Sequence, residues 1–203
     1  MKNNSLKLSP TVILIILNVA VYSTTSIITI AAGGSLLETN SDVLKTIGQS
    51  NEKVLKNSAY WQLFTAMFVH NDPLHIFMNM LFLLIFGLRA EKLFSVAEYC
   101  LIYFMSGLTG NVLTLLLPGV VSAGASGALF GLFGASTIYI RKAVGHSIVE
   151  ALIYSFLLLI ITSFSPNVNV FAHFGGLASG LVIGYVLARK REYEVVYRFS
   201  YRI

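Results

Sequence analysis

The chain has few charged residues, a single cysteine and no polar segment large enough to form a soluble domain. Of its 203 residues, 11% are charged and 56% are hydrophobic, whereas a typical soluble domain has about 25% charged residues. The lone cysteine excludes a disulfide framework and a cysteine-rich metal site. Because apolar runs extend almost from end to end, we expect one domain, residues 1–203, that lies mostly within a membrane.

The chain also lacks a continuous basic patch. Its formal net charge is +5, but the basic side chains fall in short clusters between the apolar runs. A nucleic-acid-binding protein would gather them on one face or stripe. We therefore expect a lipid bilayer around the chain and no nucleic-acid partner.

Six apolar segments approach the roughly 20 residues that a membrane-spanning helix needs. They cover about residues 11–32, 74–88, 96–117, 126–141, 148–164 and 170–187. The fourth is short, because it lies between a glycine-rich stretch and Arg141, and at 1.5 Å per residue it is about 24 Å long. If it ends at the membrane surface, it begins inside the hydrocarbon core, where a loop must be buried in protein or line a water-filled cavity. The expected fold is an all-α bundle of six transmembrane helices whose short fourth helix starts inside the membrane.

The lysines and arginines predict the orientation of this bundle, because short cytoplasmic loops carry more of them than outer loops do. Six spans put both termini on one side. If that side is the cytoplasm, it holds 11 of the 14 basic residues, namely Lys2, Lys7, Arg89, Lys92, Arg141, Lys142, Arg189, Lys190, Arg191, Arg198 and Arg202. The other three are Lys45, Lys53 and Lys56. We expect a multi-pass integral protein of a prokaryotic plasma membrane with both termini in the cytoplasm.

The outer loop, about residues 33–73, is too long for a simple connection. Trp61, Phe64 and Phe68 recur in it at helical spacing, which is typical of an element at the membrane interface. An ordinary ordered loop is an equally good interpretation.

The string Gly124-Ala125-Ser126-Gly127 places a serine at the start of the fourth helix. The first N–H groups of a helix have no carbonyl partner in their own helix, so they can bind a developing oxyanion. Taken alone the string is weak evidence, because a serine that follows glycine is common at helix starts.

His173 lies early in the sixth segment, at the same expected depth as Ser126. Gly176 and Gly180 allow a neighbouring helix to pack closely. A matching seam on the fourth segment consists of Gly127, Gly131 and Gly134. Close packing would bring the imidazole to the serine, whose proton it could accept. No aspartate or glutamate lies at that depth, so the pattern predicts a dyad, although an isolated buried histidine more often only holds helices together.

His75 and Asn79 lie one helical turn apart at the start of the second segment, so they share a face. Their side chains could donate hydrogen bonds to an oxyanion or simply join two helices. Phe130 follows Ser126 by one turn, and its ring could pack against His173 or be an ordinary aromatic residue of the span.

These motifs together resemble the rhomboid family of intramembrane serine proteases, over about residues 60–188. The similar features are His75-x-x-x-Asn79, Gly124-Ala125-Ser126-Gly127, and Ala172-His173 followed by Gly176, in that order. Each motif alone is weak evidence, but the three motifs in this order are specific.

The resemblance implies a nucleophile at Ser126, a general base at His173, and oxyanion donors at His75 and Asn79, with Gly124 near the same pocket. It also implies substrates that are single-span membrane proteins, cut where their helices unwind near the outer leaflet. The sequence departs from the family pattern at Gln62, where members commonly have arginine. That departure puts the anchoring of the first loop in question.

Two other functions share part of this pattern. A transporter also uses interrupted helices and buried polar groups, but neither inverted repeats nor embedded acidic residues are evident. A catalytically silent relative that binds membrane helices is a second alternative. Three histidines have no carboxylate at their depth and His146 falls on the cytoplasmic side, so we expect neither a metal nor a cofactor. The oligomeric state is left open.

Overall fold

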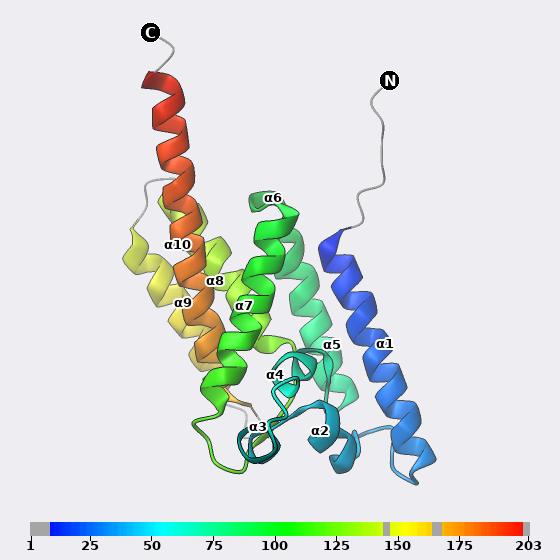
Figure 1. The fold of residues 1–203 in the computed structure, drawn as a ribbon. Coiled ribbons are helices and arrows are strands. Elements are labelled where there is room, and N and C mark those ends of the chain that lie inside the picture. The colour runs from blue at the N-terminus through cyan, green and yellow to red at the C-terminus, as the bar shows by residue number, and fades with distance from the viewer. Residues whose placement is uncertain (1–8, 144–146, 164–167, 201–203) are drawn as a thin grey trace, which may run out of the picture.

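The computed structural model describes residues 9–143, 147–163 and 168–200, and these ranges are mostly helical. Its long helices are α1 (Pro10–Ala31), α5 (Pro73–Phe82) with its continuations η2 (Leu83–Gly87) and α6 (Leu88–Leu93), α7 (Val96–Thr114), α8 (Ser126–Ala143), α9 (Ile148–Ser163) and α10 (Val170–Ser200). They form a bundle in which the start of α1 and the end of α10 lie at the same end (Figure 1). The predicted positions of Lys2, Lys7, His146 and Arg202 fall outside the described residues.

A helix lies at each of the six predicted segments, but several ends differ. The second helical stretch continues to Leu93 and the sixth to Ser200, past the ends of the predicted spans. The third stops at Thr114, where the chain turns, and Pro118 follows four residues later; a proline cannot continue a helix.

Three of these helices are long and apolar enough to cross a membrane by length and composition. They are Pro10–Ala31, Pro73–Leu93 and Val170–Arg191, and Ile148–Ile161 is a shorter apolar helix. Large apolar side chains such as Ile16, Ile161 and Val182 lie on the outer surface of the bundle. Such a surface suits lipid better than water. The chain is an integral membrane protein, and the count of six spans stays a prediction.

The starts of the long helices follow from capping residues in the sequence. Ser9 caps α1 by accepting a hydrogen bond from Val12 N. Asp72 caps α5 by accepting from His75 N at 2.7 Å. Ser95 opens α7 in a reciprocal capping box with Glu98. These bonds satisfy N–H groups that the helix itself leaves without partners.

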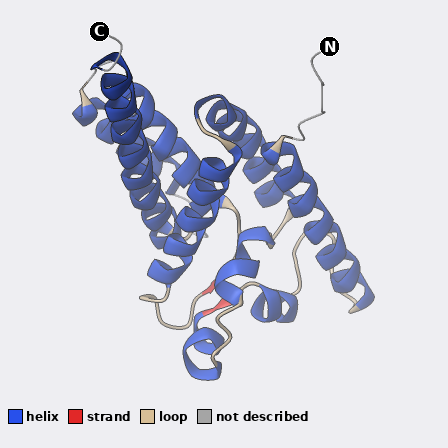
Figure 2. Ribbon diagram, turned by 45° about the horizontal axis from the view of Figure 1, so that its top comes forward, coloured by secondary structure: helices blue, strands red, loops and turns tan. Residues whose placement is uncertain are grey.

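The first loop has secondary structure of its own. It contains α2 (Ser41–Ile47), strand β1 (Gln49–Ser50), α3 (Asn51–Asn57), α4 (Gln62–Thr65) and the short helix η1 (Ala66–Phe68). Strand β1 pairs antiparallel with β2 (Val121–Ser122), just before α8 (Figure 2). Of the aromatic residues at helical spacing, Trp61 and Phe64 are exposed and Phe68 is buried. The loop is therefore bonded directly to the segment that leads into α8.

Gln62 anchors this loop. Its side chain is 1% exposed, and its Oε1 accepts a hydrogen bond from Ser50 N at 2.9 Å. Its Nε2 donates to Lys45 O at 3.0 Å and to Thr46 O at 2.9 Å. The absence of arginine here therefore does not leave the loop unanchored, because a neutral amide satisfies the same region with three hydrogen bonds.

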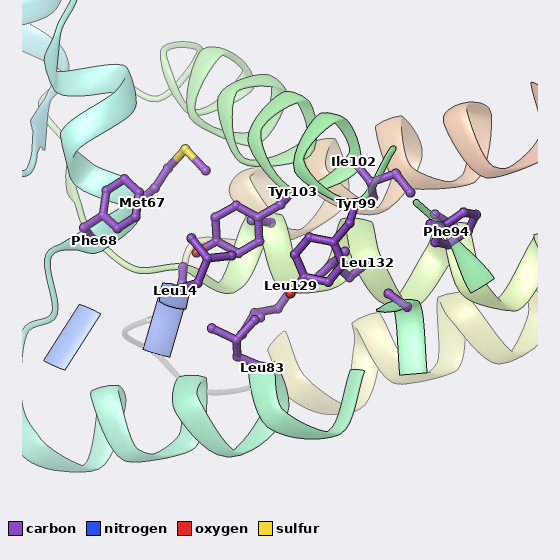
Figure 3. Packing of buried hydrophobic residues seen from close by; sticks show 14 residues of the cluster. Leu14, Met67, Phe68, Leu83, Phe94, Tyr99, Ile102, Tyr103, Leu129 and Leu132 are labelled. Carbon is purple, nitrogen blue, oxygen red and sulfur yellow. The ribbon is translucent and has the colours of Figure 1, made fainter. Parts of the chain in front are cut away.

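Helix α8 is enclosed by its neighbours, because it packs against α7, α9 and α10. Figure 3 shows the main buried cluster, in which Leu129 and Leu132 of α8 meet Tyr99, Ile102 and Tyr103 of α7. Side chains of α1, η1 and η2 complete this cluster, among them Leu14, Met67, Phe68 and Leu83. The enclosure places the start of α8 inside the bundle.

Helices α8 and α10 approach each other along the predicted seam of small residues. A Cβ atom at Gly176 would collide with the backbone of Gly127, and one at Gly180 with the backbone of Gly131. The seam extends beyond the prediction, because Gly184 faces the backbone of Ala135. Glycine is required at these positions because a side chain would force the two backbones apart.

Candidate active site

Ser126 and His173 are in direct contact. Ser126 is the first residue of α8 and His173 lies in the first turns of α10. The distance between Ser126 Oγ and His173 Nε2 is 2.8 Å, as the seam of small residues predicts. If Nε2 accepts the serine proton, Nδ1 carries the proton of the neutral ring. The pair then has the geometry of a nucleophile beside its base.

Phe130 packs on the imidazole of His173, with ring centroids 4.5 Å apart and an interplanar angle of 34°. The phenyl ring also covers part of the base, whose side chain is buried. This contact limits the rotation of His173 and so favours the orientation that faces Ser126.

Gly124 lets the chain pass close to His75. Its φ is +130°, a conformation that side-chain-bearing residues rarely adopt. A Cβ atom here would lie 2.9 Å from His75 Nε2. The N–H of Gly124 donates to Ala66 O at 2.9 Å, so this group is already used. In this structure Gly124 contributes space at the pocket, and its N–H is bonded to the loop.

His75 presents one ring nitrogen to the site. Its Nδ1 accepts a hydrogen bond from Asn71 N at 3.4 Å, so in the neutral ring the proton lies on Nε2. That atom is beside Gly124 and near the start of α8. The arrangement makes Nε2–H a donor toward the space above Ser126.

Asn79 lies one turn further along α5 and is almost fully buried. Its Nδ2 donates to His75 O at 2.9 Å. Because an amide group carries two N–H bonds, a second donor remains for a ligand in the cavity.

All five predicted site residues line one cavity of about 580 Å³, namely His75, Asn79, Gly124, Ser126 and His173. Most of its remaining wall is apolar and includes the rings of Phe82, Phe86, Phe130 and Phe133. Among the lining residues of the described chain, Asp72 is the only carboxylate. It serves as the cap of α5, which suits a site that uses serine and histidine without an acidic third member.

Asn169 is a residue that sequence reasoning missed. Its Oδ1 accepts from Ala172 N at 3.1 Å, which caps the start of α10. Its Nδ2 donates to Thr114 Oγ1 and to Ser122 Oγ, both at 2.9 Å. The side chain thus joins the end of α7, the strand before Ser126 and the helix that carries His173. Only its place just before an apolar segment could have pointed to it, as a helix cap.

His70 is a second residue without a predicted role. It is fully buried, and its ring lies edge-on to that of His75, with centroids 5.1 Å apart. Thr39 holds its backbone by donating Oγ1 to His70 O at 2.8 Å. Burial lowers the pKa of His70 to about 3, so the ring is neutral at pH 7 and supports His75 by packing.

Comparisons of the chain with a family model and with curated proteins point to the same family. The model of the Rhomboid domain matches residues 57–190. RHOMBOID-like protein 4 of Arabidopsis thaliana is 36% identical over 165 residues, which are 78% of this chain and 42% of that protein.

Two further relatives also carry rhomboid names. RHOMBOID-like protein 6, mitochondrial, of Arabidopsis thaliana is 38% identical over 156 residues, 73% of this chain and 50% of that protein. Rhomboid-like protease 3 of Toxoplasma gondii is 31% identical over 155 residues, 72% of this chain and 59% of that protein. The chain spans about half the length of the curated relatives it matches. The extent of the domain match and the identity to these relatives show that the chain belongs to the rhomboid family.

Proposed function

We propose that the chain is an intramembrane serine endopeptidase that cleaves single-pass transmembrane proteins near the outer face of the membrane. The observation that carries this proposal is the 2.8 Å contact between Ser126 Oγ and His173 Nε2, inside a cavity that donor groups also line. Family membership supports it, as does the name of the Toxoplasma gondii relative, which is a protease.

The chemistry is acyl transfer with Ser126 as nucleophile. His173 Nε2 accepts the hydroxyl proton while Oγ attacks the scissile carbonyl carbon. The tetrahedral intermediate then collapses, and the imidazolium gives its proton to the departing amine. A water molecule, activated by the same imidazole, hydrolyses the ester and restores the serine.

Hydrogen-bond donors around Ser126 stabilise the oxyanion of the intermediate. His75 Nε2–H and the remaining N–H of Asn79 point from α5, and the first N–H groups of α8 have no carbonyl partner in their own helix. Loss of one such donor in other serine hydrolases costs about 10²- to 10³-fold in kcat. These groups act before and after bond cleavage without gaining or losing a proton.

The substrate must enter as an unwound segment. A peptide bond within a helix is shielded by the adjacent turns, and its carbonyl is hydrogen-bonded along the helix. The largely apolar wall of the cavity suits side chains from a membrane span. We expect glycine or proline near the cut site to raise the cleavage rate, because both weaken the helix.

The chain is proposed to form one domain over residues 1–203, with six spans and both termini in the cytoplasm of a prokaryote. The 11-to-3 division of basic residues supports this topology. Under it, α8 ends at the cytoplasmic side with Arg141 and Lys142, and Ser126 lies within the outer half of the membrane.

The proposal is tested in liposomes that hold a single-span substrate with a glycine or proline near its outer end. The wild-type protein should cleave this substrate, and Ser126→Ala and His173→Ala should each lower kcat by at least about 10³-fold. Thermal unfolding in detergent would check that both variants keep the fold. Cleavage by Ser126→Ala at the wild-type rate would disprove the proposed mechanism.

A further inference from the structure

A second cavity, of about 460 Å³, lies between the η2–α6 stretch and the second half of α8. Arg141 at its mouth follows Ser126 by fifteen residues on the same helix, so the mouth is about 22 Å from the start of α8. The mouth of this cavity is therefore at the opposite end of α8 from the Ser126–His173 contact.

Two aromatic rings lie at the end of this cavity that is furthest from Arg141. Phe86 and Phe133 line both cavities, and their ring centroids are 5.1 Å apart. The ring pair therefore lies at the boundary between the two spaces. Further out, Ile85 and Ile140 make the wall apolar, and Ile85 is half exposed on the surface that faces lipid.

Two arginines lie at the mouth among the described lining residues. Arg141 lies there with its guanidinium 2.6 Å from Glu150 Oε2 and over the ring of Tyr154. Arg89 also lines the mouth and is exposed. Within the part of the chain that the structure describes, Arg89 forms no ion pair. Among the side chains named here, Arg141 is paired with Glu150, so the exposed guanidinium of Arg89 is the charge that an anion can balance.

Hydroxyl groups lie between the charged mouth and the apolar interior. Thr137 precedes Arg141 by one turn, so both face the same side of α8. Ser136 lines the cavity as well, and its buried hydroxyl has no hydrogen-bond partner in the described residues. Along α8 the lining therefore runs from Arg141 and Ile140 through Thr137 and Ser136 to Phe133.

We propose that this cavity binds one anionic phospholipid of the leaflet next to the basic end of the bundle. The phosphate lies between Arg89 and Arg141, and the ester groups lie at the depth of Ser136 and Thr137. One acyl chain passes Ile85 and contacts the Phe86–Phe133 pair at the edge of the cavity, and the rest of the chain lies along the lipid-facing surface. Basic pockets between membrane helices on the cytoplasmic side bind such head groups, and guanidinium groups suit phosphate because their N–H bonds match its oxygens.

The experiment uses detergent-solubilised Ser126→Ala protein, so the result does not depend on proteolysis. Native mass spectrometry measures binding of phosphatidylglycerol and of phosphatidylcholine with identical acyl chains. We expect one tightly held phosphatidylglycerol, and Arg89→Gln should weaken it by roughly fivefold, the effect of one basic side chain on an anionic lipid. Equal affinity for the two lipids would overturn the proposal.

Two further variants test whether the lipid binds in this cavity or only to the general positive charge of the surface. Lys92→Gln removes a basic residue from the same helix but outside the cavity lining, and it should leave the affinity unchanged. Ile85→Trp should fill the apolar part and weaken both lipids. If Lys92→Gln weakens phosphatidylglycerol as much as Arg89→Gln does, or if Ile85→Trp has no effect, the cavity is not the binding site.

Discussion

At the scale of single residues, the site depends on side chains that place others. His173 and Ser126 come from helices that are separated by almost fifty positions in sequence, and Asn169 bonds to the segments leading into both. Its amide is well suited to this because it accepts and donates at once. We therefore regard Asn169 as a positioning residue for the proposed reaction.

Replacing Asn169 by serine or alanine tests this role. Serine keeps a capping oxygen for α10 but is too short to reach Thr114 and Ser122, whereas alanine loses the cap as well. We expect both variants to lower kcat more than they raise KM, and only alanine to lower the stability of α10 by about 1 kcal/mol. Peptidase kinetics and thermal unfolding measure the two effects. A wild-type kcat for Asn169→Ser would show that the bridge does not position the site.

The buried His70 predicts a pH dependence of stability. Its pKa falls from the ordinary 6.5 to about 3 in the folded chain because burial disfavours the charged ring. Below pH 6.5 the unfolded chain therefore binds a proton that the folded chain does not. The free energy of unfolding should fall as pH drops from 6.5 toward 3, by up to about 1.4 kcal/mol per pH unit from this group.

His70→Phe keeps an aromatic ring against His75 and removes the titration. Denaturant unfolding between pH 7.5 and 4.5 should give a shallower decline for this variant than for the wild type. Identical slopes for the two proteins would mean that His70 is not the group responsible.

At the scale of elements, the seam between α8 and α10 determines whether the two side chains meet. Gly180→Ala adds one carbon atom that would collide with the backbone of Gly131. We expect a loss of about 1–3 kcal/mol in stability, as for other overpacked contacts, and a lower kcat because Ser126 and His173 move apart. Val186→Ile adds one carbon on the exposed face of the same helix and should change neither quantity. Normal kcat in Gly180→Ala would contradict this account of the seam.

The sequence alone predicts the long helices well, because apolar runs, capping residues and small-residue spacing are local signals. It also predicts the Ser126–His173 contact, because the spacing of Gly176 and Gly180 matches that of the glycines that follow Ser126. The hydrogen bonds of Gln62 and Asn169 could not be predicted in this way. Each joins segments far apart in sequence through a single amide, and such pairs leave no periodic pattern. The pairing of β1 with β2 involves only two residues on each strand, too few for an alternating pattern.

The hydrogen bond that Gly124 N–H donates within the chain was likewise not predictable. A glycine beside a catalytic serine suggests an open backbone, but the bond from Gly124 N to Ala66 O exists only because η1 folds back against this loop. The same glycine's positive φ and its closeness to His75 are visible only in three dimensions.

At the scale of the whole molecule, the prediction is a six-span topology. Cysteine labelling tests it in a Cys100→Ser background, with a single cysteine in place of Lys53 or Lys190. In intact expressing cells, a membrane-impermeant maleimide should label the first position at once and the second only after permeabilisation. The two positions are separated by five proposed crossings, so they lie on opposite sides. Labelling of both from the same side would contradict five crossings between the two positions.

The most direct test of the central claim, that His173 activates Ser126 inside the bundle, is labelling by a fluorophosphonate in liposomes. The adduct would be located by mass spectrometry in the wild type, Ser126→Ala and His173→Ala. The account predicts an adduct on Ser126 in the wild type, none in Ser126→Ala, and a labelling rate at least about 10²-fold lower in His173→Ala. An unlabelled wild type, or equal rates in the wild type and His173→Ala, would contradict it.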